Sequence, residues 1–187
     1  LAGTRAVLGG RALPLLFASD GQINGVIPFD TAVNARHSLL IQRGASLSVP
    51  EPVTIAPAQP AVFTDPSGRG IIAVFTADGR SFLAASGSPA TAGDVLVIYC
   101  TGLGAVNPAV PAGTAAPSSP LSETTNRVTV TLGGRPAQVA FSGLTPGFAG
   151  LYQVNAVVPE GVAAGDQVPV VLTVAGQAGR PVTIAVR

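Results

Sequence analysis

Residues 4–28 read TRAVLGGRALPLLFASDGQINGVIP, and residues 129–159 read TVTLGGRPAQVAFSGLTPGFAGLYQVNAVVP. Both stretches run from a Leu-Gly-Gly-Arg turn, through an apolar segment, to Gln-(Ile/Val)-Asn and a closing proline. Internal similarity of this kind indicates two copies of one structural unit. The recurring landmarks are Gly9, Gly10, Gln22, Asn24, Pro28, Gly133, Gly134, Gln153, Asn155 and Pro159.

The turns have the chemistry of β-hairpins. Gly-Gly accepts positive φ at both central positions of a two-residue hairpin loop. Proline lacks the amide hydrogen that a strand ladder needs, so Pro28 and Pro159 are expected to mark strand ends. Each copy contains a glutamine and an asparagine two residues apart, Gln22 and Asn24 in the first and Gln153 and Asn155 in the second. Recurrence at matched positions favours a structural role, in which the amides either hydrogen-bond to loop backbone or join the two units.

Short apolar segments bounded by Gly, Pro, Asn or Asp follow one another along the chain, which is typical of a β-sandwich. No segment has the extended apolar period of a helix, so almost no helix is expected. The one long stretch without a strand pattern is 105–125, expected as an exposed loop. Strands are expected near 4–8, 12–17, 21–28, 38–43, 52–56, 61–64, 70–76, 81–84, 94–101, 127–133, 137–142, 150–158, 168–174 and 181–186.

The sequence therefore predicts an all-β fold of two tandem immunoglobulin-like β-sandwich units. Residues 1–57 form the first and 58–187 the second. The second unit has an apolar strand, Asp94–Thr101, ahead of its repeat, whereas the first begins at the repeat itself. We expect the first unit to be incomplete at its N-terminal side. Its open edge should be covered from outside residues 1–57, by a neighbouring chain or, as a second choice, by 61–84.

Composition excludes several functional classes. Only 10% of residues are charged and the formal net charge is +1, so no electrostatic basis exists for binding nucleic acid or an anionic membrane. No apolar run approaches the roughly 18 to 20 residues of a membrane helix. The single cysteine, Cys100, lies in an apolar run and is expected to be buried and inert. Because the chain begins with Leu, we expect a fragment or a mature exported product.

Three longer segments carry a family resemblance. They are GDVLVIYCTGLGAVNP (93–108), VTLGGRPAQVAFSGLTPGFAGLYQVNAVVP (130–159) and VPVVLTVAGQAGRPVTIAV (168–186). Together they resemble an uncharacterised C-terminal domain of secreted proteins from Acidobacteria, the Solibacter type. The Thr-Gly-Leu-Gly step also looks like IPT/TIG domains, an immunoglobulin-like class. The resemblance implies an exported or cell-surface bacterial β-sandwich without catalytic residues.

Catalytic and metal-binding groups are sparse. His37 is the only histidine and no Gly-x-Ser-x-Gly elbow is present, so a solvated loop histidine is the favoured interpretation. One His and one Cys fall short of a zinc site. Asp20, Asn24, Asp30 and Asn34 offer oxygen ligands for calcium, but turn formation explains them equally well. We expect no catalytic residues, no metal and no cofactor.

Three functions remain. The first is a non-catalytic extracellular interaction or assembly module, including a self-assembling, strand-exchanging surface or filament subunit. In that case the chain forms a homo-oligomer or polymer through a sheet edge, and the terminal segment VTIAVR or LAGTRAVL is the donor strand. Another cell-surface protein or a polysaccharide is the alternative partner. The second is a carbohydrate-binding accessory domain of a larger secreted enzyme, which needs an exposed aromatic row; Phe141, Phe148 and Tyr152 are the candidates. The third, a hydrolase, has little support.

Overall fold

The structure is a computed structural model that describes Leu1 and residues 3–187. Over these residues the chain is all-β and contains no helix, as predicted. None of the described segments is therefore a helix long and apolar enough to cross a membrane. The strands before residue 57 are β1 (Thr4–Leu8), β2 (Arg11–Ala12), β3 (Leu15–Ala18), β4 (Ile23–Gly25), β5 (Ala35–Arg43), β6 (Ser46–Leu47) and β7 (Glu51–Ile55).

The strands after residue 57 follow the expected apolar segments closely, apart from several of only two residues. They are β8 (Ala61–Val62), β9 (Ile72–Phe75), β10 (Ser81–Leu83), β11 (Val95–Thr101), β12 (Val106–Asn107), β13 (Glu123–Thr124), β14 (Val128–Leu132), β15 (Arg135–Leu144), β16 (Tyr152–Val157), β17 (Gly165–Val174), β18 (Gln177–Ala178) and β19 (Val182–Val186). The 105–125 stretch is not wholly irregular, because β12 pairs with β13 inside it.

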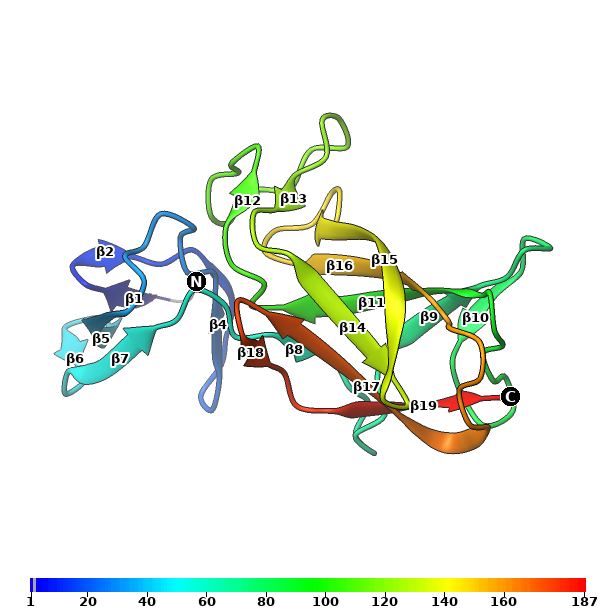
Figure 1. Cartoon of the computed structure of the whole chain (residues 1–187). Coiled ribbons are helices and arrows are strands. Elements are labelled where there is room, and N and C mark those ends of the chain that lie inside the picture. Colours follow the sequence, from blue (N-terminus) through cyan, green and yellow to red (C-terminus); the bar gives the residue numbers. More distant parts are fainter. Residues whose placement is uncertain (2) are drawn as a thin grey trace.

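Strands β8 to β19 form a β-sandwich in which β15 belongs to both layers. The start of β15 pairs with β14, and its remainder pairs with β16 after a bulge between Val139 and Phe141. One layer contains β14, β17, β18 and β19, and the other contains β8, β9, β10, β11 and β16. Figure 1 shows β14 and β17 crossing over β11 and β16.

The core of the molecule lies between these two layers. Alternate residues of each strand point into it, which is why β14, β16 and β17 alternate between buried and partly exposed positions. All buried residues of the large apolar cluster fall within 58–186. The largest fully buried side chains are Ile72, Leu96, Ile98, Leu103, Leu132, Leu144, Leu172 and Ile184.

Strands β1 to β7 enclose much less apolar volume. β2, β1, β5, β6 and β7 form one antiparallel sheet, and β3 and β4 form a separate hairpin. The buried apolar side chains here are Ala6, Leu8, Val26 and Ile55. Six large apolar side chains of this region are instead exposed: Leu16, Phe17, Ile27, Val33, Leu47 and Val49.

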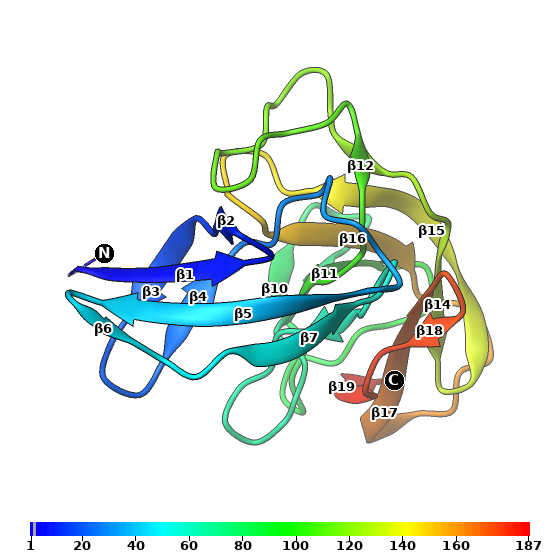
Figure 2. The same cartoon turned by 90° about the vertical axis from the view of Figure 1, so that its left-hand side faces the viewer.

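The two regions touch without sharing a sheet. No strand within 4–55 pairs with a strand within 61–186. The Phe29 ring meets the Tyr152 ring edge to face, with centroids 6.4 Å apart. Val26 lies against Gly150 so closely that a Cβ there would be 2.9 Å from it. Viewed as in Figure 2, β1, β5 and β7 lie in front of the sandwich.

Candidate functional site: the free edge of strand β4

Residues 4–55 (the first repeat) and residues 128–186 (the second repeat) have the same order of strand pairing. β1 pairs with β2 and β5 as β14 pairs with β15 and β17. β5 pairs with β6 and β7 as β17 pairs with β18 and β19. Likewise β3 pairs with β4 as β15 pairs with β16.

The recurring landmarks occupy equivalent places in this pairing. The Gly-Gly pairs close hairpins between Leu8 and Arg11 and between Leu132 and Arg135. All four glycines have positive φ, at 56° and 85° for Gly9 and Gly10 and at 57° and 79° for Gly133 and Gly134. Pro28 and Pro159 follow the ends of β4 and β16. These positions explain why glycine and proline recur there.

A β-bulge also recurs in equivalent register. It lies between Leu15 and Phe17 in β3 and between Val139 and Phe141 in β15. After the bulge, Phe17 lies opposite Asn24 and Phe141 lies opposite Asn155. The bulge lies on β15 and β3, whereas β16 itself alternates regularly between buried and half-buried residues.

The recurring amides bond to one another. Gln22 Nε2 donates to Asn24 Oδ1 at 2.7 Å, and Gln153 Nε2 donates to Asn155 Oδ1 at 2.8 Å. Because Val154 and Ala156 point into the core, Gln153 and Asn155 lie on the outer face of the sheet. We expected the amides to hydrogen-bond to loop backbone or to join the two units. These bonds instead link the two amides of each pair to one another.

The two repeats differ at the far edge of the amide-bearing strand. β16 pairs with β15 on one side and with β11 on the other. β4 pairs with β3 and, among the strands of the described residues, with no other. Residues 61–84, the second choice for closing this edge, pair instead with β11 through β8 and β9, so that choice is wrong.

The backbone of β4 presents unpaired groups along this edge. Val26 donates its N–H to the Pro14 carbonyl, and the Gln22 carbonyl accepts from Ser19, so both residues face β3. Amides alternate in direction along an antiparallel strand. The N–H and C=O groups of Ile23 and Gly25 therefore point away from β3, toward the free edge.

The side chains that face inward also differ between the repeats. In β16 and just beyond it, Val154, Ala156 and Val158 are fully buried. The matching residues before Pro28 are Ile23, which is half-buried, Gly25 and the exposed Ile27. Without a strand in the place of β11, this inner face is open to water.

A hollow of about 270 Å³ opens at one end of the first repeat. It is lined by Thr4, Ala18, Ser19, Asp20 and Arg43. Arg43 Nη1 lies 3.2 Å from Asp20 Oδ1, and both side chains are mostly exposed. The oxygens of Asp20 and Asp30, which were weighed as calcium ligands against a role in turns, lie instead beside arginine, with Asp30 Oδ1 2.9 Å from Arg11 Nη1.

His37 lies in β5 and not in a loop, which corrects the sequence-based expectation. Its ring is half-buried, and Nε2 is 2.9 Å from the Ala32 carbonyl oxygen. Its other nitrogen approaches Gly9, where a Cβ would be only 2.9 Å away. His37 aligns with Val168, because these residues pair with Val53 and Ile184 of the matching strands β7 and β19. A valine at the matching place favours a packing role.

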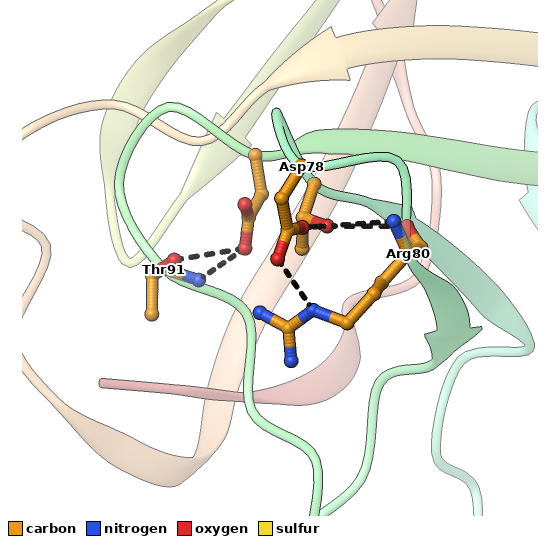
Figure 3. Close-up of polar contacts among 5 residues, drawn as sticks. Asp78, Arg80 and Thr91 are labelled. Carbon is orange, nitrogen blue, oxygen red and sulfur yellow. Dashed lines mark hydrogen bonds and ion pairs between the residues drawn. The ribbon is translucent and has the colours of Figure 1, made fainter.

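Other polar clusters stabilise turns. Figure 3 shows Asp78 accepting from the Arg80 guanidinium, and Asp94 accepts from the Thr91 hydroxyl and amide. The Thr76 hydroxyl and Arg80 hold the pKa of Asp78 below its usual range. Within Leu1 and 3–187, no three side chains of His, Cys, Asp or Glu gather as metal ligands.

Cys100 is buried and unbridged, as predicted. Burial raises the pKa of its thiol to about 12. Burial also raises the pKa of Tyr152, whose hydroxyl donates to the Gly104 carbonyl. Both side chains belong to the buried core.

Two exposed aromatic residues lie on the outer face of the layer that contains β8 and β9. Sequence analysis did not identify them as candidates for an aromatic row. Phe63 is 45% exposed and Phe75 is 46% exposed. The buried neighbour Val74 shows that Phe75 points outward, and Ile71 and Leu83 extend the apolar surface. Of the sequence-based candidates, Tyr152 is buried and Phe141 half-buried, while Phe148 is exposed in a loop. The sequence signal that could have identified Phe75 as outward-facing is the alternation of inward and outward residues along β9.

Comparison of the chain with protein-family models, with curated proteins and with solved structures finds no match.

Proposed function

We propose that this chain is a non-catalytic extracellular interaction module whose first repeat accepts an extended strand of another protein along β4. The observation that carries the proposal is the contrast between β16, which is covered by β11, and β4, whose outer edge pairs with no described strand. An unpaired edge with free N–H and C=O groups is a template for strand addition.

The donor is a separate protein because the suitable strands of this chain are already used. β1 lies between β2 and β5, and β19 pairs with β17. The terminal segments LAGTRAVL and VTIAVR would have to leave these ladders to serve a neighbour. Polymer formation through either terminus therefore costs the pairing that each strand already has.

A non-catalytic role is supported by the contacts of the titratable groups. The His37 ring nitrogen bonds to a backbone carbonyl, and the carboxylates of Asp65, Asp78 and Asp94 accept bonds within their own turns. No pair of these groups is arranged as nucleophile and base. Export to a bacterial cell surface is part of the proposal, and fractionating the cells that naturally produce the protein tests it.

The edge is tested with a synthetic peptide of residues 93–102, the natural strand on the equivalent edge, carrying an added tryptophan. The chain contains no tryptophan, so the peptide alone reports binding by its fluorescence. Ile23→Lys places a charge on the inner face of the edge strand and should weaken binding at least about tenfold. Leu16→Lys, on the bulge of β3, is the matched control and should bind normally. Failure of the wild-type protein to bind the peptide would contradict the proposal.

A second candidate is polysaccharide binding by the outer face of β8 and β9. Phe63 and Phe75 lie on one sheet face, with the amides of Gln153 and Asn155 on the same face two strands away. An exposed aromatic platform beside polar groups is the arrangement that sugar rings require.

Pull-down with insoluble cellulose and chitin tests this candidate. Wild-type protein should sediment with one of the polymers, and the Phe63→Ala/Phe75→Ala variant should remain in solution. Phe148→Ala removes an exposed aromatic from the loop between β15 and β16, outside this outer strand face, and should sediment as wild type does. Equal sedimentation of all three proteins would refute a role for this face.

A further inference from the structure

The alignment of the repeats indicates which positions of a bound strand would face which residues of β4. In the second repeat, Leu96, Ile98 and Cys100 lie opposite Ala156, Val154 and Tyr152. The residues that match these three in the first repeat are Gly25, Ile23 and Gly21. A strand bound along β4 therefore has three successive inward positions, which face those residues.

The two repeats differ most at the third of these positions. In the second repeat this end of the sandwich is apolar and closed, with Val128, Tyr152 and Val174 all buried. Register places Thr4 and Arg43 where Val128 and Val174 pair with each other. Gly21 replaces the tyrosine, and a Cβ on it would meet nothing within 4 Å.

The hollow lined by Thr4, Ala18, Ser19, Asp20 and Arg43 lies at this end of the first repeat, where Gly21 directly follows Asp20 in the chain. Its lining contains donors from the Arg43 guanidinium and acceptors from the Asp20 carboxylate, and the two charges balance. A long neutral polar side chain can bond to both groups, whereas an apolar one would leave them without a new partner. A charged side chain would approach one group of its own sign.

We infer that the partner strand runs antiparallel to β4, with apolar side chains facing Gly25 and Ile23 and a glutamine-like amide facing Gly21. This inference rests on the proposed function, because it specifies the occupant of the same edge. The partner is a separate protein, since β1, β11 and β19 of this chain are already paired.

Two peptides based on residues 93–102, each with an added tryptophan, test the inference. One carries Gln and the other Leu at the position of Cys100. Wild-type protein should bind the Gln peptide about three- to tenfold more tightly, the effect of one added hydrogen bond. Asp20→Ala/Arg43→Ala should abolish this preference. Arg11→Ala/Asp30→Ala removes an ion pair elsewhere in the first repeat and should preserve it.

The other outcomes separate the two levels of the argument. Equal binding of both peptides, or preference for Leu, overturns the inference and leaves the proposed edge intact. Absence of binding by either peptide overturns the proposed function itself. Sedimentation velocity of the chain alone tests whether a second copy of the chain occupies the edge. An oligomer that the peptide dissociates would identify a second copy as the occupant and would overturn the inference that the partner is a separate protein.

Discussion

Single residues distinguish two repeats that share their strand pairing. His37 and Val168 occupy matching places, and each lies against the glycine that begins the hairpin, Gly9 or Gly133. The hairpin and register are retained although one side chain is polar and the other apolar. The backbone arrangement therefore tolerates exchange at this position.

His37→Val should leave the fold and binding of the 93–102 peptide unchanged. Valine is the residue that the second repeat uses at this place, and it removes only one exposed hydrogen bond to Ala32. Thermal unfolding and peptide titration measure both properties. Loss of any function with an unchanged melting curve would show that the imidazole has a chemical role.

Cys100 should resist modification in the folded protein. Its thiol pKa is raised to about 12 by burial, so below that pH the protonated, unreactive form predominates. Labelling with a bulky disulfide reagent at pH 8 should be slow in buffer and fast in denaturant. Rapid labelling of the native protein would contradict the buried placement.

At the scale of elements, strands differ widely in how much apolar surface they bury. β11 is central in its sheet and contributes Leu96, Ile98 and Cys100 to the core. β6 is a two-residue strand at the edge of the first sheet, and Leu47 in it is 67% exposed. The same chemical change should therefore have very different effects in the two strands.

Ile98→Ala should lower the free energy of unfolding by about 2–5 kcal/mol, because it leaves a cavity in a fully buried site. Leu47→Ala should change it by no more than about 0.5 kcal/mol. Urea denaturation followed by circular dichroism measures both values. Similar values for the two variants would mean that the core is not centred on β11.

At the scale of the whole molecule, stability is unevenly distributed. The large apolar cluster lies in 58–186, whereas the first repeat exposes much of its apolar surface. Residues 58–187 expressed alone should fold cooperatively. Residues 1–57 alone should not, because β3 and β4 form an isolated hairpin, which is marginal in water. Far-UV circular dichroism and thermal melts of the two fragments test this. A disordered 58–187 fragment would contradict it.

Much of the secondary structure could be predicted from the sequence, because strand signals are local. Alternating apolar residues and Gly-Gly turns located most of the longer strands, and the apolar run around Cys100 indicated its burial. His37 was assigned to a loop because its sequence neighbours are polar. In the structure its strand, β5, pairs with both β1 and β7. The exposed Phe63 and Phe75 were missed because apolar residues in a strand were assigned to the core.

The sequence by itself determined that the chain is all-β and that one motif recurs, because turn chemistry and a two-residue period act over a few neighbouring residues. Tertiary structure alone decided that 61–84 pair with β11, that both terminal strands are already in ladders and that the edge of β4 is left without a strand. These outcomes depend on which distant segments win each hydrogen-bonding edge. That competition is settled by the apolar surface buried on pairing, a quantity that no local pattern contains.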